Sequence, residues 1–143
     1  MRPVIDLSKE YGLVLDGGGA RGAYQIGAWK ALHEAGVRIR GIAGTSVGAL
    51  NGALICMGDV DEAERIWKEM TFSKVMDVDD EWMERLFHKQ TTIKEFLNEG
   101  WKRLKDGGID ITPLRNLIHE VIDEDAIRKS GKEFCLLTFS LSD

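Results

Sequence analysis

The stretch Gly44-Thr45-Ser46-Val47-Gly48 decides the fold, because it places a serine between two glycines where an apolar strand passes into an apolar helix. The pattern Gly-x-Ser-x-Gly is typical of a nucleophile elbow, a sharp turn that presents a serine hydroxyl at the end of a strand. Glycines on either side permit the tight turn, since a β-carbon would clash there. We therefore predict a strand over about 37–43 and a buried helix that starts at Ser46 and runs to about residue 57.

A second motif, Asp16-Gly17-Gly18-Gly19-Ala20-Arg21-Gly22, precedes the first and has the same kind of setting. It follows an apolar run, predicted as a strand over 11–15, and it opens a helix. A glycine run at the start of a helix offers several unobstructed backbone N–H groups, and such donors can stabilise an oxyanion. Arg21 adds a positive charge. The motif therefore predicts an oxyanion hole.

The segment between the motifs predicts how they meet. Its helix carries one face of mostly small residues, and this face is predicted to pack on the sheet: Ala28, Ala31, Leu32 and Ala35. A strand-helix-strand unit of this length implies two parallel strands. Both motifs then leave the carboxyl ends of neighbouring strands, where α/β sheets bind ligands. We expect Ser46 to lie close to Gly17, Gly18 and Gly19.

A dinucleotide-binding site is the main competing interpretation, because residues 17–22 also match Gly-x-Gly-x-x-Gly between a strand and a helix. That site requires an acidic residue at the end of the second strand, where it binds the ribose. Here the second strand ends in Gly44-Thr45-Ser46, which carries no carboxylate. The nucleotide interpretation is therefore disfavoured.

The two motifs and the helix between them resemble the patatin-like phospholipase family, in its bacterial-type form, most strongly over residues 11–58. The resemblance implies a three-layer α/β/α fold with a mainly parallel central sheet, and a serine lipid acyl hydrolase that uses a Ser-Asp dyad, a phospholipid or fatty-acyl ester substrate and no cofactor. Carried over, it makes Ser46 the nucleophile and Gly44, Thr45, Val47 and Gly48 its elbow. The oxyanion hole would comprise Gly17, Gly18, Gly19, Arg21 and Gly22.

The dyad aspartate of the family lies in a late Asp-Gly-Gly or Asp-Gly-Ala motif. The one literal match here is Asp106-Gly107-Gly108, which follows a predicted helix with a basic last turn, and two glycines in that position usually end a helix. We therefore favour a helix-ending loop at Asp106. The chain is expected to be the N-terminal portion of a single domain (1–143), truncated before the dyad aspartate and inactive alone.

Two further functions stay open from the sequence. An α/β-hydrolase triad would use Ser46, Asp106 and His119, although the predicted helix after Thr112 places His119 within a helix rather than in a loop. A non-catalytic binding or regulatory fragment would keep the fold without turnover.

Composition narrows the partners. The net charge of −5 and the absence of a basic stripe argue against a nucleic-acid partner, and peripheral membrane contact would have to rest on apolar surface.

Cys56 and Cys135 lie among apolar residues and are expected to be buried thiols, and three scattered histidines predict no metal site. Residues 1–12 lack a signal-peptide pattern, so a cytoplasmic location is expected. The oligomeric state is not specified.

Overall fold

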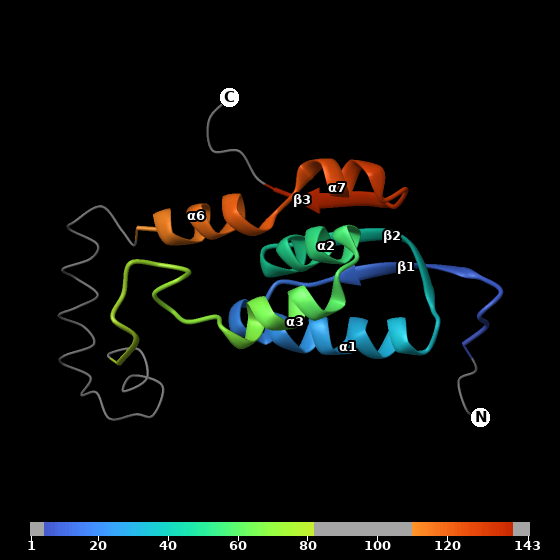
Figure 1. The fold of residues 1–143 in the computed structure, drawn as a ribbon, viewed down its shortest axis with the longest axis horizontal. Helices are drawn as coiled ribbons and strands as arrows, with labels where there is room; N and C mark the ends of the chain where they lie inside the picture. Colours follow the sequence, from blue (N-terminus) through green and yellow to red (C-terminus); the bar gives the residue numbers. More distant parts are fainter. Residues whose placement is uncertain (1–4, 82–109, 139–143) are drawn as a thin grey trace. The chain divides into compact units, whose positions relative to one another are not determined.

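The computed structural model describes residues 5–81 and 110–138 (Figure 1). The chain divides into two compact units, of which one comprises Met1–Lys68 with Ile122–Asp143 and the other Glu69–Val121. Both glycine-containing motifs belong to the first unit. The helix expected before Asp106, and Asp106 itself, lie outside the described residues.

The first unit is built on a parallel sheet of three strands in the order β1-β2-β3, which confirms the predicted α/β class. Strand β1 is Glu10–Leu15, β2 is Arg38–Thr45 and β3 is Glu133–Leu137. Strand β2 ends two residues later than predicted, because Gly44 pairs with Leu15 of β1 and Thr45 pairs with Leu137 of β3. The motifs therefore follow the carboxyl ends of two neighbouring parallel strands, as expected.

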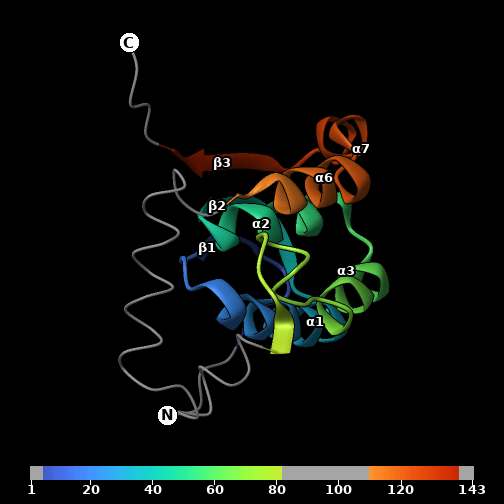
Figure 2. The same ribbon diagram turned by 90° about the vertical axis from the view of Figure 1, so that its left-hand side faces the viewer.

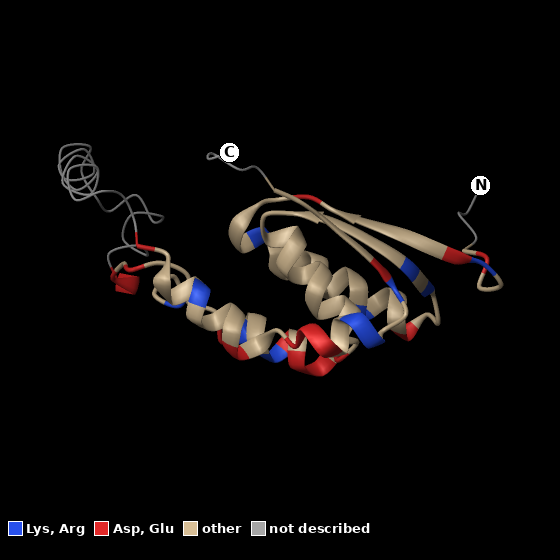
Figure 3. Cartoon of the chain, turned by 90° about the horizontal axis from the view of Figure 1, so that it is seen from above, with Lys and Arg blue, Asp and Glu red and all other residues tan. Residues whose placement is uncertain are grey.

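The helices of this unit lie on one side of the strands (Figures 2 and 3). They are α1 (Gly22–Glu34), α2 (Val47–Met57), α3 (Val60–Lys68) and α7 (Glu124–Lys129), with a single 3₁₀ turn, η1 (Gly19–Arg21). Of the three layers expected, the described residues of this unit form the sheet and one helical layer.

The other face of the sheet is apolar and exposed. Val14, Ala43 and Cys135 are partners across the three strands, and Val14 is 82% exposed while Leu137 is 75% exposed. This placement corrects the expected burial of Cys135, which is exposed because it lies on the sheet face that the described helices of this unit do not cover. Cys56, in contrast, is buried as predicted, and burial raises the pKa of its thiol.

Helix α2 forms the centre of the core. It packs against all three strands, and its buried residues run almost without interruption: Gly48, Asn51, Gly52, Ala53, Leu54, Ile55 and Cys56. The prediction of a wholly apolar, buried helix is confirmed, with one amide inside it. A β-carbon on Gly52 would lie 2.8 Å from the Phe134 ring of β3, so a glycine here lets the helix lie close to the sheet.

Helix α1 buries a different face from the one predicted. Its buried residues are Gly22, Ile26 and Trp29, while Ala28, Ala31 and Ala35 are exposed and Leu32 is half-buried. The larger apolar side chains turn toward α2 and α3, because burying them removes more apolar area from water than burying alanines.

Asp59 caps helix α3, since its Oδ1 accepts a hydrogen bond from the N–H of Glu62 at 2.9 Å. Ala63 and Ile66 are buried. The Glu64 carboxylate joins α3 to α1, since it pairs with Lys30 of α1 and with Lys68 at 2.8 Å. Hydrogen bonds from these two lysines lower the pKa of Glu64 to about 2.

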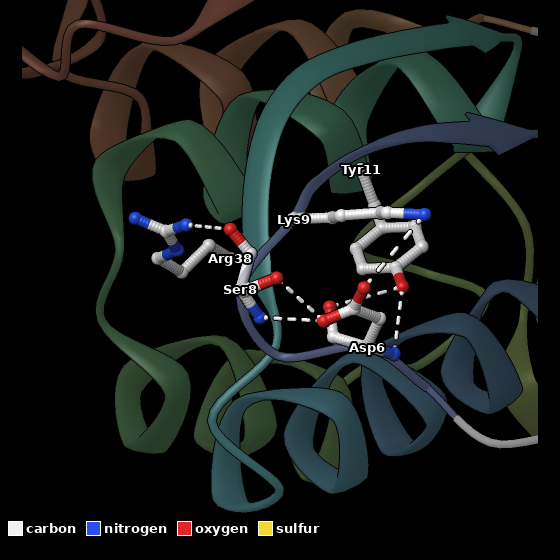
Figure 4. A network of polar contacts seen from close by, with 5 residues as sticks. All are labelled: Asp6, Ser8, Lys9, Tyr11 and Arg38. Carbon is white, nitrogen blue, oxygen red and sulfur yellow. Dashed lines mark hydrogen bonds and ion pairs between the residues drawn. The ribbon is translucent and has the colours of Figure 1, made fainter.

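The amino end of β1 is held by a polar network (Figure 4). Asp6 Oδ1 accepts hydrogen bonds from the N–H and the hydroxyl of Ser8, at 3.0 and 2.6 Å, and these bonds lower the pKa of Asp6. Arg38 Nη2 donates to the Ser8 carbonyl at 2.6 Å. The network thus ties the segment before β1 to the first residue of β2.

The second unit contains α6 (Thr112–Val121), the helix predicted after Thr112. The N–H and the hydroxyl of Thr112 both donate to Asp110 Oδ1, at 2.8 and 2.6 Å. The N–H of Asp77 donates to the Asp110 carbonyl at 2.9 Å and joins the two described stretches of this unit.

None of the helices in the described part of the chain is long and apolar enough to cross a bilayer.

Two glycines let α2 begin directly against the ends of the strands. A β-carbon on Gly44 would overlap the backbone carbonyl of Gly48. A β-carbon on Gly48 would overlap the carbonyl of Leu15 and would lie 2.8 Å from the carbonyl oxygen of Asp16. Since these neighbours are backbone atoms, they cannot turn away as a side chain would. The close approach of α2 to β1 therefore depends on glycine at position 48, and its close approach to β2 depends on glycine at position 44.

We predict that Gly48→Ala lowers the free energy of unfolding by about 2–3 kcal/mol or more, because the new methyl group overlaps fixed backbone. Gly27→Ala is the matched control. Gly27 lies within α1, and a β-carbon there would meet no atom within 4 Å. This control should raise stability by about 0.5–1 kcal/mol through helix propensity. Urea denaturation measures both values, and equal effects of the two substitutions would contradict the close approach.

Candidate active site

Ser46 occupies the junction between β2 and α2 in a rare backbone conformation. Its φ is 52° and its ψ is −129°, and among residues 5–81 and 110–138 no other residue except glycine has a positive φ. Such a conformation costs about 1–3 kcal/mol and occurs most often at functional sites. The helix begins at Val47, one residue later than predicted, and Ser46 is its N-cap residue. The side chain of Ser46 is exposed, as a residue that reacts with a substrate requires.

The glycine motif lies beside Ser46. A β-carbon on Gly17 would lie 3.2 Å from Ser46 Cβ and 3.8 Å from Ser46 Oγ. The two motifs therefore meet, as the parallel strand pair predicts. The remaining elbow residues have structural contacts: Thr45 ends β2, and the Val47 methyl carbon Cγ2 lies against Gly22.

The backbone N–H groups of the glycine motif fall into two groups. Three are engaged: Gly17 donates to Asp16 Oδ1 at 2.8 Å, Arg21 donates to the Gly18 carbonyl at 3.2 Å, and Gly22 donates to carbonyls of η1. The N–H groups of Gly18, Gly19 and Ala20 donate to no described residue. Gly19 has a φ of 55°, which a glycine adopts without strain. The Arg21 side chain lies against Gly18, where a β-carbon would be 3.6 Å from Arg21 Cβ.

The charged residues of the strands lie at their amino ends, in Glu10, Arg38, Arg40 and Glu133 (Figure 3). The carboxyl ends, which carry both motifs, are apolar.

A polar chain centred on the buried Asn51 lies behind the glycine motif, and the sequence analysis missed it. The Trp67 indole N–H of α3 donates to Asn51 Oδ1 at 2.8 Å, Asn51 Nδ2 donates to Gln25 Oε1 at 2.8 Å, and Gln25 Nε2 donates to the Asp16 carbonyl at 2.7 Å. Asn51 Nδ2 also donates to the Gly22 carbonyl at 2.9 Å. The available signal was a single amide within the apolar run 47–57.

No proton acceptor for Ser46 is evident in the described part of the chain, where Ser46 Oγ makes no hydrogen bond. Asp106 lies outside the described residues, so its role is untested. His119 lies within α6 and is exposed. No group of His, Cys, Asp and Glu side chains that could hold a metal ion occurs among the described residues.

Comparison with known proteins gives a consistent picture. A family model described as patatin-like phospholipase matches residues 13–137. A lysophospholipase nte1 of Aspergillus terreus is 63% identical over 46 residues, which cover 32% of this chain and 3% of that protein. Neuropathy target esterases sws of Drosophila persimilis and Drosophila grimshawi are each 49% identical over 74 residues, covering 47% of this chain and 5% of theirs. The chain thus corresponds to a small part of these relatives. No solved structure matches it significantly.

We predict that Ser46→Gly raises the free energy of unfolding by about 1 kcal/mol, because glycine relieves most of the strain at φ 52° even after its own entropy cost. Ser46→Ala is the matched control: it also removes the hydroxyl but keeps the β-carbon, and should give no such gain. Urea denaturation of the two variants measures the difference. Equal stability of Ser46→Gly and Ser46→Ala would contradict the strained backbone.

Proposed function

Because the chain belongs to the patatin-like phospholipase family, we propose that its two motifs form the nucleophile and oxyanion hole of a serine lipid acyl hydrolase. One observation carries the proposal: Ser46 has a strained elbow conformation and Gly17 of the glycine motif lies against its side chain. A nucleophilic serine must be exposed to its substrate, as Ser46 is. The oxyanion that forms on the substrate needs hydrogen-bond donors close to that serine.

In the proposed reaction, Ser46 Oγ attacks the carbonyl carbon of a fatty-acyl ester and loses its proton to a base. The carbonyl oxygen becomes an oxyanion, for which the proposed donors are the N–H groups of Gly18 and Gly19, which donate to no described residue. The positive end of the α2 dipole and the Arg21 guanidinium favour the same negative charge. The ester bond then breaks, the base returns the proton to the leaving alcohol, and water releases the fatty acid from the acyl-serine.

We propose that an aspartate serves as the base, as the resemblance implies. Asp106 is the sequence candidate for it, although the helix-ending interpretation is favoured there. Little ester hydrolysis by these 143 residues alone stays a prediction from the sequence. The α/β-hydrolase alternative is weaker, because its histidine would be His119, in the middle of α6.

The substrate class follows from the family and from the relatives, whose names are lysophospholipase and neuropathy target esterase. We propose a phospholipid or another fatty-acyl ester, bound with its acyl chain along the apolar carboxyl ends of the strands. Peripheral membrane contact and a cytoplasmic location stay predictions from the sequence.

A fluorophosphonate probe tests the proposal directly, because it reacts with serines that have an oxyanion hole. We predict that Ser46 is labelled at least about a hundredfold faster than any other serine of the chain. Labelling should vanish in Ser46→Ala and persist in Ser8→Ala, the control at a serine of the β1 network. Peptide mass spectrometry locates the adduct. Equal labelling of Ser46→Ala, or an adduct on other serines with none on Ser46, would overturn the proposal.

The same probe tests whether Asp106 is the base that accepts the proton of Ser46. We expect Asp106→Asn to keep the labelling rate of Ser46, as a helix-ending aspartate would. A large loss of labelling in Asp106→Asn, with an unchanged circular dichroism spectrum, would instead identify Asp106 as the proton acceptor.

A further inference from the structure

We propose that Asn51, through Gln25 and with Trp67, is a positioning residue that fixes the glycine motif against Ser46. This inference rests on the proposed function, because it assigns the buried amide chain to the placement of the proposed oxyanion donors. Asn51 is 0% exposed in a helix whose other buried residues are apolar or glycine. A buried amide stabilises a fold only when its polar atoms are bonded, so an alanine or leucine would be the simpler choice for packing alone.

The hydrogen bonds that link Trp67, Asn51, Gln25 and Asp16 can have only one donor-to-acceptor direction. An indole N–H can only donate, so Asn51 must present Oδ1 to Trp67 and its NH₂ group to the other side. The two N–H bonds of that group go to the Gly22 carbonyl and to Gln25 Oε1. Gln25 must then present its own NH₂ group to the Asp16 carbonyl. The orientation of each amide is thereby set by Trp67, and the chain ends at the residue that begins the glycine motif.

The chain holds the motif at both of its ends. At the first end, the Asp16 carbonyl accepts from Gln25 and also lies against Gly48, where a β-carbon would be 2.8 Å from its oxygen. At the second end, the Gly22 carbonyl accepts from Asn51, and a β-carbon on Gly22 would be 2.6 Å from the Trp67 ring. The free N–H groups of Gly18 and Gly19 lie between these two anchors. Their position relative to Ser46 therefore depends on the amide chain.

Isosteric substitutions test this role. Asn51→Asp replaces the NH₂ group by an oxygen, which can no longer donate to Gly22 or Gln25. Gln25→Met keeps the length of the side chain and removes its bond to Asp16. Asn116→Asp is the matched control. It makes the same chemical change at an exposed residue of α6. NMR relaxation of the ¹⁵N-labelled full chain reports the mobility of residues 16–22 in each variant.

We predict that Gln25→Met and Asn51→Asp lower the order parameters of the Gly18 and Gly19 amides from about 0.85 to below about 0.6, while those of β2 stay unchanged. The Asn116→Asp control should change neither. The amide exchange of Arg21 and Gly22 should quicken by about threefold to tenfold, the effect of one lost hydrogen bond. A merely structural role would lower the thermal midpoint and leave the glycine motif ordered, and that result would overturn the inference.

The fluorophosphonate reaction provides the functional readout. We predict that Gln25→Met slows the maximal labelling rate of Ser46 by about tenfold and leaves the probe concentration for half-saturation unchanged, because the variant displaces only the oxyanion donors. An unchanged maximal rate would contradict the positioning role. The relaxation experiment does not require a reactive serine, so a mobile glycine motif with an unreactive Ser46 would sink the proposed function while leaving the placement by Asn51 intact.

Discussion

The close approach between Gly48 and the carbonyls of Leu15 and Asp16 is the constraint on which the rest of the site depends. It brings the first turn of α2 onto the end of β1, and the chain can reach that position from β2 only through a sharp turn. Ser46 takes that turn with a φ of 52°. The strain at one residue is therefore offset by the packing of a whole buried helix on the sheet.

The same constraint joins the two motifs. The Asp16 carbonyl lies against Gly48, and the next residue, Gly17, lies beside Ser46. A β-carbon on Gly17 would be only 3.2 Å from Ser46 Cβ. The glycines that follow leave two backbone N–H groups unengaged within the described structure. Behind them, Asn51 and Gln25 bond the ends of the motif to α2 and α1. A strained serine, a glycine motif and a buried amide chain thus form one connected arrangement at the carboxyl ends of β1 and β2.

Much of this arrangement could be predicted from the sequence, because glycine spacing and apolar runs act locally. The parallel strands, the turn at Ser46 and the buried α2 all follow from such patterns. Tertiary packing, which local patterns do not specify, determined the buried face of α1, the exposure of Cys135 and the hydrogen bonds of Asn51. The helical period of α1 allowed either an alanine face or the Ile26 and Trp29 face, and the larger side chains were buried. The exposure of Cys135 depends on which sheet face the helices cover, and the Asn51 bonds depend on partners distant in sequence.

The most direct test of the account is a crystal structure of the chain with Ser46 phosphonylated. The account predicts that the phosphonyl oxygen lies about 2.7–3.1 Å from the N–H nitrogens of Gly18 and Gly19, with the Gly17–Ser46 contact retained. A phosphonyl oxygen that points into solvent, or an adduct held by donors from another segment, would contradict the assignment of the glycine motif as the oxyanion hole.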